Sequence, residues 1–165
     1  MNKFTEEMAT VDAVMRKQDD RLNELTSKLA ERVAALDKVE KSVFDDLQAI
    51  IAREGGGQVS FRDGGRTCTV EPLEDGSIKA TYRSDFTSDP LHEAFLHSSN
   101  TEETEAIENF DALRRAHIHY ENRAAGIALA QKLIETYVSW QRAIANDRSR
   151  LIDAIVGKDD EESYW

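Results

Sequence analysis

Residues 4–43 decide the fold, and they read FTEEMATVDAVMRKQDDRLNELTSKLAERVAALDKVEKSV. Apolar side chains recur here at alternating intervals of three and four, and residues 1–54 contain no Gly or Pro. A strict seven-residue repeat keeps one seam along a helix and is typical of a left-handed coiled coil. We therefore predict one long coiled-coil helix over residues 1–54. Its seam consists of Phe4, Met8, Val11, Met15, Gln18, Leu22, Leu25, Leu29, Arg32, Leu36, Val39 and Val43.

Two seam positions are polar, and they allow two interpretations. Gln18 and Arg32 can specify the register or the oligomer state at a cost in stability. Alternatively, Arg32 extends its charged end to water while the neighbouring Val33 fills the seam. Gly55-Gly56-Gly57 then ends the helix, because three residues without Cβ favour a left-handed cap.

Residues 55–86 change to a period-two pattern that predicts a small sheet. The segments 58–62, 66–71 and 77–83 alternate apolar and polar side chains, and they are separated by stretches containing Asp-Gly. Asp-Gly supplies the positive φ angles of tight hairpins, so we expect a three-stranded antiparallel meander. Its apolar face is too small to stand alone and must pack on helices.

The remaining chain predicts a second long helix. Residues 87–101 are expected to form a loop and a short helix over Leu91–His97, and Ser99 to Glu103 resemble a capping region. A long C-terminal helix is predicted over residues 102–157, followed by an acidic tail over residues 158–165. Between Ala124 and Ile134 the apolar side chains widen to most of the circumference, which indicates burial on more than one side.

Together these segments predict a mostly α fold of one domain, in which two long helices flank the β-meander. Short connections favour an antiparallel pairing of the helices, and the wide belt suggests that a second copy packs there, giving a homodimer. The residues predicted to hold this oligomer are Met8, Val11, Met15, Leu22, Leu25, Leu29, Leu36, Val39, Val43, Ile127 and Ile134.

Composition limits the class of protein. Asp and Glu number 32 against 21 Lys and Arg, and no segment is apolar enough to span a membrane. The N-terminus is acidic within seven residues, which argues against a signal peptide. We therefore expect a cytoplasmic protein. One cysteine, Cys68, excludes an internal disulfide within the chain and indicates a buried structural thiol.

The common catalytic patterns are missing from the sequence. It has no P-loop, dinucleotide fingerprint, His-Glu-x-x-His or nucleophile elbow. His117 and His119 lie two residues apart, so they point in nearly opposite directions on a helix and cannot share one metal; His92 and His97 are also poorly spaced. Adjacent carboxylates diverge by about 100° on a helix. We expect no enzyme activity, no cofactor and no metal.

Two arginine clusters are candidate contacts for a partner or for nucleic acid. The first comprises Arg114, Arg115 and Arg123, and the second comprises Arg142, Arg148 and Arg150 beside Trp140. Interleaved arginine and aromatic side chains can hold a single strand by stacking and phosphate contacts. The alternative is that these arginines pair across one helical turn with the intervening carboxylates of Asp111, Glu121, Asp147 and Asp153.

The most economical function is an assembly or adaptor protein that acts through protein contacts, including contacts with itself. The alternative is a nucleic-acid-associated protein, either a single-strand binder or an acidic mimic that occupies the groove of a DNA-binding protein. The order of helix, small sheet and helix resembles in outline small phage-encoded accessory proteins such as the Gam-type nuclease inhibitors. This resemblance lies in architecture alone, so it assigns no role to any residue.

Overall fold

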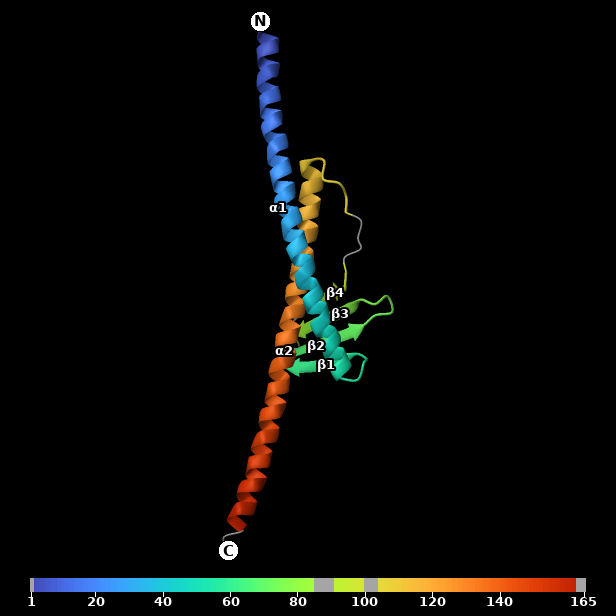
Figure 1. Cartoon of the computed structure of the whole chain (residues 1–165), viewed down its shortest axis with the longest axis vertical. Helices are drawn as coiled ribbons and strands as arrows, with labels where there is room; N and C mark the ends of the chain where they lie inside the picture. The colour runs from blue at the N-terminus through green and yellow to red at the C-terminus, as the bar shows by residue number, and fades with distance from the viewer. Residues whose placement is uncertain (1, 85–90, 100–103, 163–165) are drawn as a thin grey trace.

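The computed structural model of the chain describes residues 2–84, 91–99 and 104–162. Two long helices lie side by side over part of their lengths, and a small sheet packs against this overlap (Figure 1). The predicted mostly helical fold, with two long helices and a small antiparallel sheet, is confirmed. The elements are α1 (Lys3–Arg53), β1 (Val59–Asp63), β2 (Arg66–Pro72), β3 (Ile78–Ser84), β4 (His92–Leu96) and α2 (Phe110–Glu162).

Capping contacts define both ends of helix α1. The Asn2 side chain accepts a hydrogen bond from Thr5 N at 2.8 Å, which satisfies one free amide of the first turn. At the other end Gly56 adopts a φ of 94°, and its amide donates to the Ile51 carbonyl at 2.8 Å. A side chain is strained at this φ, so glycine ends the helix as predicted.

The sheet has four antiparallel strands in the order β1-β2-β3-β4, where we predicted three. The three predicted strands are present, but the helix predicted over Leu91–His97 is wrong, because β4 occupies most of this segment. Its side chains alternate, with Ala94 and Leu96 buried and Phe95 exposed. Ala94 pairs with Ala80 of β3, so the segment gains a ladder of backbone hydrogen bonds that a single helical turn would not offer.

The predicted bounds of the C-terminal helix are also corrected. Helix α2 begins at Phe110 rather than residue 102, because the Asn109 side chain caps it by accepting from Ala112 N at 2.8 Å. The predicted capping region lies partly outside the described residues, since residues 100–103 are not described. At its other end α2 continues through Gly157 to Glu162, so most of the predicted acidic tail is helical.

The two helices run parallel, and the predicted antiparallel pairing is wrong. Arg123 of α2 contacts Glu40 of α1, and Tyr137 of α2 contacts Glu54 beyond the end of α1, so both sequences advance in the same direction. The start of α2 lies nearer to the N-terminal end of α1 than β4 does (Figure 1). Helix α2 therefore makes a second pass along α1 in the same direction.

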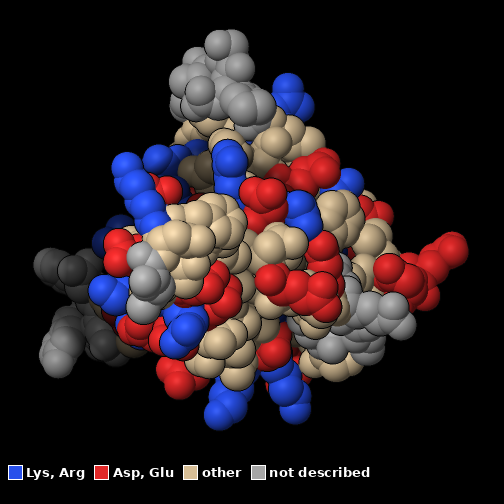
Figure 2. Space-filling view, turned by 90° about the horizontal axis from the view of Figure 1, so that it is seen from above, with Lys and Arg blue, Asp and Glu red and all other residues tan. Residues whose placement is uncertain are grey.

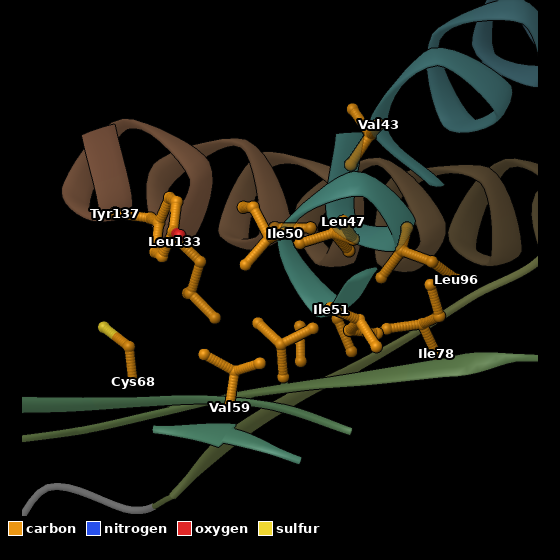
Figure 3. Packing of buried hydrophobic residues seen from close by; sticks show 14 of the residues in the cluster. Val43, Leu47, Ile50, Ile51, Val59, Cys68, Ile78, Leu96, Leu133 and Tyr137 are labelled. Atoms are coloured by element: carbon orange, nitrogen blue, oxygen red, sulfur yellow. The ribbon is translucent and has the colours of Figure 1, made fainter. Parts of the chain in front are cut away.

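One hydrophobic core joins the helices to the sheet. Figure 3 shows side chains of α1 and α2 pointing toward the strands, with Leu47 and Leu133 fully buried. The other face of α2 in this region packs on α1, which explains the wide apolar belt. Ile127 is buried within the chain, so the belt does not require a second copy.

Candidate interaction surfaces

Helix α1 extends beyond α2 at its N-terminal end, and we call residues Lys3–Arg21 the N-terminal arm (Figure 1). On this arm the seam is open: Phe4 is 70% exposed and Met15 is 55% exposed. The same seam is closed further along, where Leu22 is 8% exposed and Leu29 is 7% exposed beside the start of α2. The arm therefore presents an apolar stripe that no described residue covers.

Helix α2 extends beyond α1 at its C-terminal end, and we call residues Arg142–Glu162 the C-terminal arm (Figure 1). Just before it, Tyr137 and Gln141 both donate hydrogen bonds to Glu54. Tyr137 and Gln141 lie four residues apart, and alternating intervals of three and four residues continue this seam along the arm through Ile144, Arg148, Leu151 and Ile155. The most exposed apolar side chains on the arm are Leu151, Ile152, Ile155 and Val156, each 51–62% exposed.

The residues predicted to hold an oligomer fall into two groups. Those covered wholly or partly by the chain itself are Leu22, Leu25, Leu29, Leu36, Val43, Ile127 and Ile134. Those exposed are Met8, Val11, Met15 and Val39. Val39 is 39% exposed because α1 turns Glu40 toward α2 in its place. This rotation follows from the 3.6-residue period of the helix, which drifts away from a strict heptad.

A buried ionic cluster joins α1 to α2 at Glu40. Nη2 of Arg123 donates to Asp37 Oδ1 at 2.5 Å and to Glu40 Oε1 at 3.1 Å. Burial lowers the pKa of Arg123, but the hydrogen bonds to Glu40 and Asp37 outweigh it and raise this pKa overall. Arg123 is one of the predicted partner contacts, but its side chain bonds to Asp37 and Glu40 within the helix pair. The heptad pattern gave no signal for Glu40.

A cleft of about 340 Å³, lined by both apolar and polar side chains, adjoins this cluster between β4 and the two helices. Glu93 and His97 line it from the strand side, and His119, Asn122 and Arg123 line it from α2. In the part of the chain that the structure describes, no three His, Cys, Asp or Glu side chains come together as metal ligands do. The cleft therefore offers hydrogen-bonding groups from both β4 and α2.

Trp140, the predicted aromatic contact, is partly buried and packs against the hydrophobic core. Its ring stacks on Phe61 of β1 with centroids 6.0 Å apart, and it also contacts the ring of Tyr137. The Tyr137 hydroxyl donates to Glu54 Oε1 at 2.5 Å; burial and this hydrogen bond raise the pKa of Tyr137. The cluster fixes the point where α1 ends against α2.

The other predicted arginines lie at the surface. Arg115 pairs with Glu105 at 2.7 Å, which holds its pKa above the ordinary value. Arg114 is exposed on α2. Arg142, Arg148 and Arg150 are exposed on the C-terminal arm. In the first predicted cluster, Arg115 and Arg123 form ion pairs and Arg114 is exposed to solvent. The three arginines of the second cluster are all exposed on the C-terminal arm.

The predicted burial of Cys68 is confirmed. Burial, reinforced by the charge of Asp63, raises the pKa of its thiol to about 11. A thiol with such a pKa is a weak nucleophile at neutral pH, because so little thiolate forms. Cys68 is therefore part of the core.

Comparison of this chain with protein families, with curated proteins and with solved structures gave no match. Across residues 2–84, 91–99 and 104–162, no helix is long and apolar enough to cross a membrane.

Proposed function

We propose that this protein is a non-enzymatic assembly or adaptor protein that binds helices along the seams of its two arms, including those of its own copies. One observation carries the proposal: the seam of α1 is buried at Leu22 and Leu29 but open from Phe4 to Met15. Long apolar stripes on a helix normally face another element. Helices in proteins gain most of their stability from packing and little from the helix propensity of their residues. A projecting arm would therefore be stabilised by a partner helix.

The size of the stripes indicates reversible binding. The four seam residues Phe4, Met8, Val11 and Met15 are 40–70% exposed, so covering them would contribute about half of the 1.5–3 kcal/mol expected for full burial of each side chain, or roughly 3–6 kcal/mol in total. Association costs about 4–15 kcal/mol in lost freedom. Because the two ranges overlap, we expect assembly to depend on concentration.

Light scattering on the intact protein tests this proposal. We expect a mass above the 18.6 kDa of one chain at micromolar concentration, and a return to one chain for the double variant Val11→Asp/Met15→Asp. The matched control is Ala13→Asp, which adds charge to the same arm on the opposite face. A wild-type protein that stays at one chain at all concentrations contradicts self-assembly.

Nucleic-acid binding is the second candidate, supported by the exposure of Arg142, Arg148 and Arg150 on one arm. It predicts retarded migration of a single-stranded oligonucleotide, weakened by salt and by Arg148→Glu/Arg150→Glu. The acidic-mimic form has less support, because Figure 2 shows acidic and basic side chains interspersed on the face seen along the long axis. A mimic predicts no oligonucleotide binding, together with displacement of DNA from a target protein.

A further inference from the structure

We infer that copies of this chain join head to tail, with the N-terminal arm of one copy packed in parallel along the C-terminal arm of the next. This inference rests on the proposed self-assembly and adds which arms meet and in which direction. It follows from three properties of the arms: where their seams face, how long they are, and how their seam residues are spaced.

Each arm continues the seam between α1 and α2. On the N-terminal arm, Met15 continues the face that Leu22 and Leu29 turn toward α2. On the C-terminal arm, Ile144 continues the face that Tyr137 and Gln141 turn toward Glu54, at the end of α1. The open stripe of each arm therefore faces the place where the other helix would lie if it were longer.

The arms also match in length. The N-terminal arm has 19 residues and the C-terminal arm has 21, and they project from opposite ends of the molecule (Figure 1). At 1.5 Å per residue these are about 28 Å and about 31 Å. When the arms of two copies overlap, the second α1 begins near the end of the first α1, and the second α2 begins near the end of the first α2.

The seam residues of the two arms have the same spacing, which sets a register. Each seam residue on the C-terminal arm lies 140 residues, or twenty heptads, after its counterpart on the N-terminal arm. The pairs are Phe4 with Ile144, Met8 with Arg148, Val11 with Leu151, and Met15 with Ile155. Parallel helices with equal spacing bring equivalent seam positions to the same level.

Two other ways of pairing the arms are disfavoured. If C-terminal arms paired in parallel with each other, Arg148 would meet its own copy in the seam, and two like charges would repel. A closed antiparallel dimer would place the C-terminal arm of one copy against the open stripe of the N-terminal arm of the other, and the reverse. Each open stripe faces a position in line with the other helix of its own copy. The α2 helices of the two copies would therefore have to occupy the same space in the middle of the dimer. A head-to-tail contact avoids both problems and leads to open chains of copies.

Blocking one arm at a time tests the inference. The variant Val11→Asp/Met15→Asp blocks the N-terminal arm, and Leu151→Asp/Ile155→Asp blocks the C-terminal arm. We expect each variant alone to have the mass of one chain, and a 1:1 mixture to have the mass of two, because each supplies the arm that the other lacks. The wild type should exceed two chains as concentration rises. Far-UV circular dichroism checks that all variants remain helical.

Disulfide trapping provides an independent readout. Mixing Val11→Cys with Leu151→Cys should give a disulfide-linked heterodimer, whereas the opposite-face control Ala13→Cys mixed with Leu151→Cys should give little. Three results would overturn the head-to-tail contact but not self-assembly. They are a blocked variant that forms dimers alone, a wild-type mass that stops at two chains, and disulfide trapping only between like arms. A wild type that remains one chain overturns both proposals.

Discussion

The guanidinium of Arg123 on α2 lies against the carboxylate of Glu40 on α1, with Nη2 3.1 Å from Oε1, and the two side chains are only 15% and 5% exposed. Water cannot screen a pair this deeply placed as it screens a surface pair. Asp37 shares the same nitrogen from a more exposed position, being 42% exposed. Together with the hydrogen bond from Tyr137 to Glu54 at the end of α1, this contact sets the longitudinal register of the two helices.

Removing Arg123 should therefore destabilise the chain. We expect Arg123→Met to lower the free energy of unfolding by about 3–5 kcal/mol, because Glu40 stays buried without its partner. The double variant Glu40→Leu/Arg123→Met should recover most of this loss, since apolar side chains can replace a buried pair. Urea denaturation measures both. Arg115→Met, at the exposed pair with Glu105, serves as a control with no measurable change. If Arg123→Met and Arg115→Met lowered the free energy of unfolding equally, the burial of the Arg123–Glu40 pair would be unimportant.

Gly126 lets α2 approach β4 closely. A Cβ atom at this position would lie 3.3 Å from the Ala94 Cβ. We expect Gly126→Ala to be nearly neutral, because a gain of about 1 kcal/mol in helix propensity offsets the tight contact. Gly126→Val should destabilise by about 1–3 kcal/mol as β4 is displaced. Thermal unfolding of both variants tests this, and a Val variant as stable as the Ala variant would mean that β4 moves away freely.

Stability should fall in alkali. The pKa of Cys68 is raised from 9.0 to about 11 in the folded chain, so the fold favours the protonated thiol. The resulting stabilisation is complete below pH 9 and is lost as the pH rises toward 11, amounting to about 2–3 kcal/mol. Cys68→Val, which cannot ionise, should lose less stability over this range in urea denaturation. Part of the loss should remain, because Tyr137 titrates in the same direction. Identical pH profiles would exclude a contribution from the thiol.

Local patterns were sufficient to predict much of the fold. An uninterrupted heptad followed by three glycines predicted α1, and Asp-Gly turns between alternating segments predicted β1, β2 and β3. Both signals depend on residues close in sequence. The exposed seam residues Met8, Val11 and Met15 were found by the same pattern, although nothing in the pattern separated them from Leu22 and Leu29, which the chain covers itself.

Features that depend on distant partners were not predictable in this way. Five residues of β4 carry both helical and strand signals, and the free edge of β3 decides between them. The parallel direction of α2 depends on where its long connection ends. Glu40 looks like an ordinary surface carboxylate until Arg123, 83 residues later, is placed beside it. In each case tertiary contact overrides the local preference.

The covered and open parts of the α1 seam should respond differently to the same charge. Leu29→Asp places an unpaired carboxylate where the chain buries the side chain, so we expect a loss of several kcal/mol in the free energy of unfolding. Val11→Asp lies where the side chain is 45% exposed, so at concentrations too low for assembly we expect a change within about 0.5 kcal/mol. Thermal denaturation followed by circular dichroism in dilute solution distinguishes the two. If Val11→Asp were as damaging as Leu29→Asp under these conditions, the N-terminal arm would have to be packed within its own chain rather than open to a partner.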